Sequence, residues 1–364
     1  MFYRTFEKHA EMISRQFQWL SFIALIGVVV IHSRSYSTLP NPGMLVKWEQ
    51  YFVAESLVRF SVQTFFAISG FWWARKWNGG IFEGYVTLMA KKWRTLILPY
   101  LIWSVLGAFL SLALTGANNL GTHRPFFERS VFAIHGIWPF VDNLFGINKA
   151  GPLGDMPLWF SRQLILFFAI TPLIALILRK AVLAFVLAFG LIFFARHFPS
   201  PPFVFIFPGW LGWFVLGTAI ARTDLVERPY SKMAAILSGF TWIAASLVST
   251  IHQVCALQYC AGAQDFVARV IVLSGMIFWW EMTFVLAKRD LPSVAGNLFF
   301  VYAFHQFPAQ AVISTMHFVF GKGQIETFAS FLISPIITFY ACNVVYHMVD
   351  RIWPRALRFA TGGR

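Results

Sequence analysis

Long apolar segments, separated by short polar and basic connections, run through almost the whole chain. About ten of them are long enough to cross a lipid bilayer as helices. They cover residues 17–34, 56–74, 94–115, 157–178, 181–197, 204–222, 233–251, 268–287, 293–316 and 326–349. The pattern therefore predicts an all-α fold, a polytopic integral membrane bundle of about ten transmembrane helices.

The composition agrees with a membrane environment. Hydrophobic residues make up 58% of the 364 residues and charged residues only 12%, with 42 Phe and 15 Trp. One soluble core cannot enclose so much apolar surface, so we expect membrane lipids around the chain. The net charge of +14 does not predict a nucleic-acid partner, because the basic residues fall between the apolar segments.

The distribution of basic residues predicts the topology. If the N-terminus is cytoplasmic, most of the 29 Lys and Arg residues fall on the cytoplasmic side of the membrane, as the positive-inside rule requires. The predicted protein therefore lies in the inner membrane with both termini in the cytoplasm. Residues 1–350 are predicted to form a single transmembrane domain, and residues 351–364 a short basic cytoplasmic tail. Within the long outer connection, Val131–Ile147 is apolar enough to lie in the interface or to dip back into the bundle.

Four ionisable residues stand at similar depths in the predicted helices. His32, Arg59, Arg162 and His305 each lie about 16 or 17 residues from a basic marker at the inner side, which is roughly 24–26 Å along a straight helix. The markers are Arg15, Arg75, Arg179 and Arg289. Two histidines and two arginines are therefore predicted to share one plane in the outer half of the bilayer.

Such a plane is predicted to be a functional site, because charged groups in hydrocarbon are costly unless they face a cavity. Each residue alone also has a structural interpretation. An arginine near a helix end can reach the headgroups, and a single histidine can be a hydrogen-bonded packing residue. Glu55 lies one turn from Arg59, so this pair can neutralise itself. The four residues together favour a site.

Five sequence motifs resemble the acyltransferase family 3 membrane proteins over nearly the whole chain. In order, they are Val-Val-Val-Ile-His-Ser at 28–33, Arg-Phe-Ser-Val-Gln-Thr-Phe-Phe-Ala-Ile-Ser-Gly-Phe at 59–71, Pro-Leu-Trp-Phe-Ser-Arg-Gln-Leu at 157–164, Trp-Phe-Val-Leu-Gly at 213–217 and Phe-Val-Tyr-Ala-Phe-His at 300–305. The resemblance implies a ten-helix acyltransferase. Such an enzyme moves an acyl group, usually acetyl or succinyl, from cytoplasmic acyl-CoA to a hydroxyl or amino group of a surface glycan or glycolipid precursor.

The resemblance also implies that His32 is the catalytic histidine. A neutral imidazole can take the proton of an acceptor hydroxyl as it attacks the thioester, and guanidinium groups can stabilise the oxyanion. We therefore expect His32 to be the general base, with Arg59 and Arg162 as catalytic partners; whether His32 instead carries the acyl group covalently is left open. The other predicted site residues are His305, Trp159 and Glu55 for substrate binding and Lys91, Lys92 and Arg94 for the phosphates of CoA, with no metal.

One position departs from the family pattern. The fullest family pattern has an arginine eleven residues before the histidine, and this chain has Ser21 there, which puts the donor in question more than the reaction. The nucleophile elbow of hydrolases, the His-Glu-x-x-His zinc motif and the phosphate-binding glycine loop are missing. The main alternative is a transporter or flippase of a glycan or lipid-linked sugar that uses the same charged plane as its binding site. The oligomeric state cannot be predicted.

Overall fold

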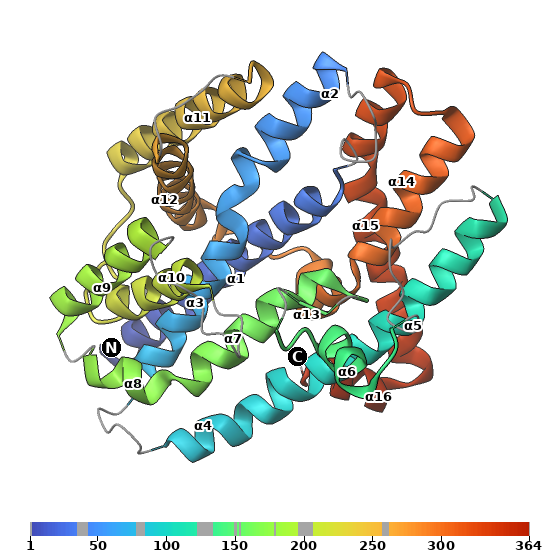
Figure 1. Cartoon of the computed structure of the whole chain (residues 1–364). Helices are drawn as coiled ribbons and strands as arrows, with labels where there is room; N and C mark the ends of the chain where they lie inside the picture. Colours follow the sequence, from blue (N-terminus) through green and yellow to red (C-terminus); the bar gives the residue numbers. More distant parts are fainter. Residues whose placement is uncertain are drawn as a thin grey trace. The chain divides into compact units, whose positions relative to one another are not determined.

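The fold is that of a computed structural model, which describes residues 2–34, 43–77, 84–121, 134–148, 151–152, 154–177, 180–195, 207–256 and 262–363. Within these ranges the regular structure is helical throughout, as predicted (Figure 1). The chain divides into two compact units, which are described one after the other.

Unit 1 comprises Met1–Trp77, Ile177–Ala195 and Gly209–Leu298. Its helices are α1 (Phe2–His32), α2 (Met44–Glu49), α3 (Phe60–Arg75), α9 (Ala181–Phe194), α10 (Pro208–Ile220), α11 (Lys232–Val254) and α12 (Ala263–Leu286). A π-helical turn at Gln50–Ala54 and a 3₁₀ turn at Leu57–Arg59 lie between α2 and α3, and a 3₁₀ turn at Ser293–Asn297 follows α12.

Unit 2 comprises Asn78–Leu176, Arg196–Pro208 and Phe299–Arg364. Its helices are α4 (Tyr85–Lys92), α5 (Leu98–Gly121), α6 (Ile137–Phe145), α7 (Trp159–Ala169), α8 (Thr171–Ile177), α13 (Leu298–Phe304), α14 (Gln306–Phe320), α15 (Gln324–Ile352) and α16 (Pro354–Thr361). A π-helical turn at Trp93–Ile97 joins α4 to α5, and a 3₁₀ turn at Met156–Leu158 leads into α7.

Five helical segments among the described residues are long and apolar enough to cross a membrane, as expected of an integral membrane protein. They are Glu11–His32, Tyr85–Leu114, Lys232–Val254, Ala263–Leu286 and Gln324–Ile352. Three shorter apolar helices cover Ala181–Phe194, Pro208–Ile220 and Ser293–Phe304. The prediction of about ten spans therefore stays a prediction.

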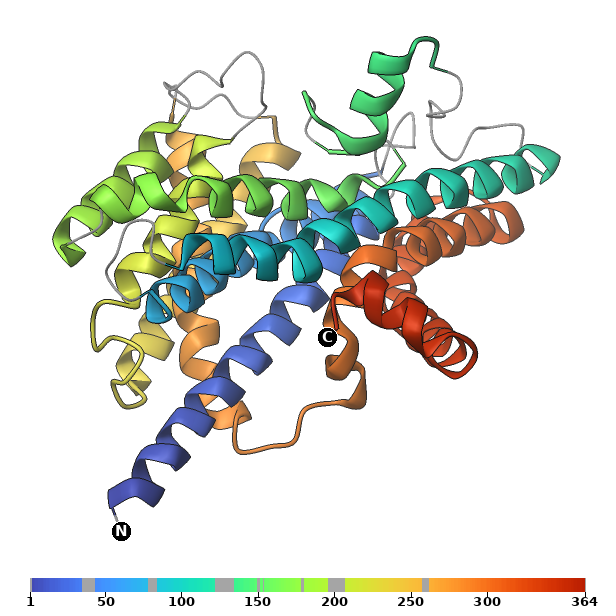
Figure 2. The ribbon, with the colours of Figure 1, turned by 90° about the horizontal axis from the view of Figure 1, so that it is seen from below.

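The straight helices assumed for the depth estimate are present in only two of the four cases. α1 runs unbroken from the N-terminus to His32 (Figure 2), and α3 is continuous from Phe60 to Arg75. The path to Arg162 is broken at Ile170, and Arg179 lies outside the described residues. The path from Arg289 to His305 includes a non-helical segment and a 3₁₀ turn. The straight-helix assumption was therefore wrong for Arg162 and His305, and their depths are unassigned.

Two of the motifs that carried the family resemblance meet in unit 1. A Cβ added at Gly70 of α3 would overlap the main-chain oxygen of Phe214, and one added at Gly217 of α10 would overlap that of Ala67. Glycine at both positions lets the two helix backbones touch, as small residues do in membrane bundles. These motif residues therefore serve packing.

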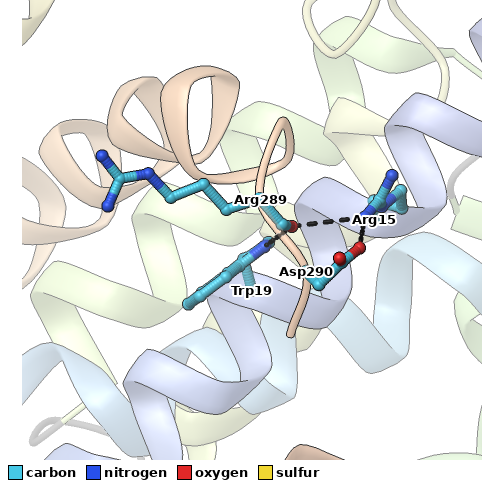
Figure 3. A network of polar contacts seen from close by, with 4 residues as sticks. All are labelled: Arg15, Trp19, Arg289 and Asp290. Atoms are coloured by element: carbon cyan, nitrogen blue, oxygen red, sulfur yellow. Dashed lines mark hydrogen bonds and ion pairs between the residues drawn. The ribbon is translucent and has the colours of Figure 1, made fainter. Parts of the chain in front are cut away.

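A polar network attaches α1 to the chain after α12 in unit 1 (Figure 3). The Arg15 guanidinium donates to the main-chain oxygen of Arg289 at 3.2 Å and pairs with the Asp290 carboxylate at 2.9 Å. The Trp19 indole donates to the same Arg289 oxygen at 3.4 Å. Arg15 and Arg289, two of the predicted inner markers, therefore lie side by side.

The residues predicted as a basic tail form the helix α16, which packs on α5 within unit 2. Leu357 is buried, and the Trp103 indole donates to the main-chain oxygen of Ala360 at 2.9 Å. α16 ends at Gly362 in the left-handed conformation, with φ +69°, directly against the main chain of Thr95. Glycine suits this position because it has no Cβ to clash there.

Candidate active site

His32 is the last residue of α1 and is half-buried. α1 crosses α3 at Gly27, where an added Cβ would overlap the Ser61 hydroxyl. This crossing lies about one and a half turns before His32. α1 also packs against the 3₁₀ turn Leu57–Arg59, and an added Cβ at Gly27 would meet the side chain of Val58 in this turn. His32 therefore ends the helix that packs against the turn carrying Arg59, and both residues belong to unit 1.

A second arginine, Arg34, pairs with Glu55, the residue that was predicted to pair with Arg59. The Glu55 carboxylate forms an ion pair with Arg34, which stands two residues after His32. The exposed Arg59 guanidinium lies 3.5 Å from the main-chain oxygen of Glu55, and its electrostatic neighbours are Arg269 and Asp265 of α12. Arg34 was missed by the sequence reasoning, although its position just after the histidine was a signal. Its pair with Glu55 ties the chain after His32 to the turn before Arg59.

Arg162 of α7 is buried and bonds to a neighbouring segment of unit 2. Its guanidinium donates to the main-chain oxygen of Ile147, just beyond the end of α6. The Tyr100 hydroxyl of α5 donates to the oxygen of Phe145 in the same helix end. The C-terminal end of a helix carries a partial negative charge, which suits a guanidinium. Arg162 therefore anchors α6, the described part of the outer segment that was predicted to lie in the interface or dip back.

His305 lies at the junction of α13 and α14 and is fully buried. Its Nδ1 is 3.1 Å from the oxygen of Val301 and 2.8 Å from that of Tyr302. Since a carbonyl oxygen only accepts hydrogen bonds, Nδ1 carries the proton and Nε2 is the basic nitrogen of the neutral ring. The fold fixes which nitrogen of His305 can take up a proton.

Trp159 begins α7 and is half-buried, with its ring edge-on to Phe207 at 6.3 Å between centroids. Of the predicted CoA-binding residues, Lys91 in the last turn of α4 and Arg94 in the π-helical turn are exposed. The Lys92 ammonium lies 3.7 Å from the centroid of the buried Phe168 ring, which is a cation–π contact. Lys92 thus contributes to packing between α4 and α7.

Four further polar residues gather around Arg162 in unit 2. The Tyr302 hydroxyl donates to the main-chain oxygen of Pro157 at 2.7 Å and accepts from the Ser161 hydroxyl at 3.1 Å. Tyr100 interacts electrostatically with Arg162, and Asp155 with both tyrosines. We call Tyr100, Asp155, Ser161, Arg162 and Tyr302 the unit 2 polar cluster; all five are buried. Ser161, Arg162 and Tyr302 lie in the sequence motifs at 157–164 and 300–305, and this was the sign in the sequence that could have pointed to the cluster.

The predicted site residues therefore fall into two groups. His32, Glu55 and Arg59 belong to unit 1, whereas the others belong to unit 2: Lys91, Lys92, Arg94, Trp159, Arg162 and His305. The plane through the two histidines and two arginines stays a prediction.

Comparisons with known proteins agree with the motif resemblance. A family model described as an acyltransferase domain, of acyltransferase family 3, matches residues 15–347. The succinoglycan biosynthesis protein ExoH of Rhizobium meliloti is 25% identical over 369 residues, which cover 97% of this chain and 93% of that protein. No solved structure matches.

Proposed function

Because the chain belongs to acyltransferase family 3, we propose that it moves an acyl group from acyl-CoA to a hydroxyl or amino group of a surface glycan or glycolipid precursor. The similarity to a protein of succinoglycan biosynthesis supports a polysaccharide as acceptor. Acetyl is the first donor group to test, and succinyl the second. The protein would lie in the inner membrane with both termini in the cytoplasm, as the basic residues favour.

The observation that supports the proposal is that α1, which ends at His32, packs against the Leu57–Arg59 turn. In the reaction, neutral His32 takes the proton of the acceptor hydroxyl, and the oxygen attacks the thioester carbonyl carbon. Arg59 stabilises the negative charge that develops on the carbonyl oxygen. Collapse of this intermediate breaks the C–S bond, and the thiolate of CoA leaves with the proton from His32.

The residues of unit 2 are assigned supporting roles. Lys91 and Arg94, both exposed, would bind the phosphates of CoA, while the Lys92 ammonium makes a cation–π contact with Phe168. Arg162 would act mainly by holding α6, because its guanidinium bonds to the Ile147 oxygen. His305 would relay a proton through Nε2, and Trp159 would offer its ring to a sugar.

The test is release of free CoA by the purified protein in nanodiscs, with acetyl-CoA and succinyl-CoA as donors and an acceptor fraction added. We expect His32→Ala to lower turnover by at least about a hundredfold, the usual contribution of a general base. His347→Ala is the matched control, since His347 is an exposed histidine of α15. Absence of thioester cleavage with either donor, in a folded protein, would reject the transferase and favour the transporter.

A further inference from the structure

Asp155 is a completely buried carboxyl group that the mechanism above does not use. Its exposed fraction is 0%, and neither side-chain oxygen has a hydrogen-bond partner among the described residues. Asp155 precedes the 3₁₀ turn Met156–Leu158, where an aspartate commonly caps the helix start, yet its side chain makes no capping bond. The ordinary local explanation for an aspartate at this position therefore does not apply.

Close packing holds this carboxyl group inside unit 2. The Cβ of Asp155 lies 2.7 Å from the position that a Cβ on Gly107 of α5 would occupy. Gly154 is packed in the same way against the main chain of Ala108. A larger residue at Gly107 would displace Asp155, so the sequence of α5 leaves room for the aspartate there.

The surroundings of Asp155 are rich in hydroxyl groups. Tyr100, Ser104 and Gly107 follow one another at i, i+4 and i+7, which places them on one face of α5. Tyr302 of α13 contributes a second phenol, which interacts electrostatically with Asp155. The arginine of the cluster, Arg162, has its guanidinium bonded to the Ile147 oxygen.

The protonation state matches this environment. Burial raises the pKa of the Asp155 carboxyl well above its usual value, which favours its neutral, protonated form. A neutral carboxyl group both donates and accepts a hydrogen bond, as an alcohol does. It is therefore complementary to a hydroxyl group and poorly suited to phosphate or to a metal ion.

A buried polar group without a partner destabilises a fold, and native proteins contain few of them. No described residue supplies a hydrogen-bond partner to the Asp155 carboxyl group, and the hydroxyl group of a bound molecule can supply one. We propose that Asp155 binds a hydroxyl group of the acyl acceptor, a polyhydroxylated sugar, with Ser104 and Tyr100 lining the same site. This assignment rests on the proposed function. The acceptor suits the site better than the donor, because CoA is recognised through its phosphates.

The experiment compares stability with acceptor dependence in the full-length protein in nanodiscs. The variants are Asp155→Leu, which removes the carboxyl group at similar volume, and Asp155→Asn, which keeps two hydrogen-bonding atoms. The probe is radiolabelled acyl-CoA, with transfer of label measured into the cell-envelope fraction of a strain that lacks this protein. Acceptor and donor are each titrated, and the melting temperature is recorded.

We expect Asp155→Leu to keep or raise the melting temperature and to raise the acceptor amount for half-maximal rate about tenfold, as for a lost hydrogen bond. The donor concentration for half-maximal rate should change less than about twofold, and Asp155→Asn should show a smaller acceptor effect. Asp142→Leu is the matched control: the Asp142 carboxylate accepts from the main-chain N–H of Asn148 at 2.6 Å, so this variant should melt lower.

A melting temperature lowered by Asp155→Leu and equally by Asp155→Asn would show a structural role and overturn the assignment. An unchanged acceptor titration would overturn it too, as would an effect on the donor alone. If the wild type cleaves no thioester, the proposed function fails by itself. The melting temperatures then still decide whether the carboxyl group supports the fold.

Discussion

The two units hold their charged side chains in different ways. In unit 1, arginines meet carboxylates on exposed or partly exposed surfaces, in the pairs Arg15–Asp290, Arg34–Glu55, Arg75–Glu227 and Arg269–Asp265. In unit 2, the buried Arg162 bonds to a main-chain oxygen and Lys92 lies over an aromatic ring. The carboxyl group of Asp155 has no partner among the described residues.

This difference separates two uses of charge. An exposed ion pair contributes little to stability, and its members can be exchanged without harm to the fold. A buried guanidinium or carboxyl group is costly to keep, so its partners fix its position closely. Unit 1 is therefore expected to tolerate changes at its pairs, and unit 2 to lose stability when the buried Arg162, which is bonded to the Ile147 oxygen, is changed.

Glu49 is the exception in unit 1 and gives the largest predicted effect. It is buried at the end of α2, and burial raises the pKa of its carboxyl from 4.5 to about 8. Between these pH values the folded chain binds a proton that the unfolded chain releases, so stability falls as pH rises, by about 1.4 kcal/mol per pH unit. We expect Glu49→Gln to remove this decline, measured as melting temperature at pH 6 and pH 9.

The control for this test is Glu227→Gln, which alters an exposed, paired carboxylate in the same unit. It should leave the pH dependence as in the wild type. Equal slopes for the wild type and Glu49→Gln would mean that Glu49 is ionised in the folded chain. Glu49 would then not differ from the carboxylates of unit 1 that form ion pairs with arginines.

Arg162→Leu is the next largest change. Loss of the bond to the Ile147 oxygen should lower the free energy of unfolding by about 2 kcal/mol, a typical value for a bond with a charged partner. Hydrogen exchange should speed up in α6, which measures its release directly. Arg75→Leu is the control from unit 1, where the exposed pair with Glu227 predicts about 0.5 kcal/mol. Equal losses in the two variants would remove the contrast between the units.

Trp103→Phe tests how firmly α16 is attached to α5. The variant keeps ring packing against Phe300, 5.6 Å away between centroids, but loses the indole bond to Ala360. About 1 kcal/mol should be lost, which corresponds to roughly fivefold faster tryptic cleavage at Arg355 and Arg358. Trp353→Phe serves as the control because Trp353 is exposed. Cleavage at the wild-type rate would show that α16 stays bound without this hydrogen bond.

The sequence predicted the features that depend on long apolar runs. α1 covers most of the predicted segment 17–34 and α3 most of the segment 56–74, with His32 at the end of α1 and Arg59 in the 3₁₀ turn before α3. Apolar length and helical period are local properties, so a single sequence displays them. The Arg34–Glu55 pair was within reach of the same reasoning, since both residues flank the predicted site.

The polar cluster of unit 2 was beyond such reasoning. Tyr302 forms hydrogen bonds with Pro157 and Ser161, which are more than a hundred positions away in the sequence. The spacing of apolar residues cannot predict a contact between such distant positions. The break in the helix at Ile170 depends on a local change of main-chain bonding inside an apolar run. The helix α16 lies in the short basic stretch after the last apolar segment, and Leu357 is the one apolar residue that it buries.

The smallest predicted effect comes from the most exposed pair. Asp290 is fully exposed, so Asp290→Asn should shift the melting temperature by less than about 1 °C, and the shift should vanish at high salt. The chain after α12 stays attached to α1, because the bonds of Arg15 and Trp19 to the Arg289 oxygen do not involve this carboxylate (Figure 3). Thermal melts at low and high salt measure the effect. A loss as large as that of Trp103→Phe would mean that the pair orders the connection, and that exposed ion pairs in unit 1 also determine local structure.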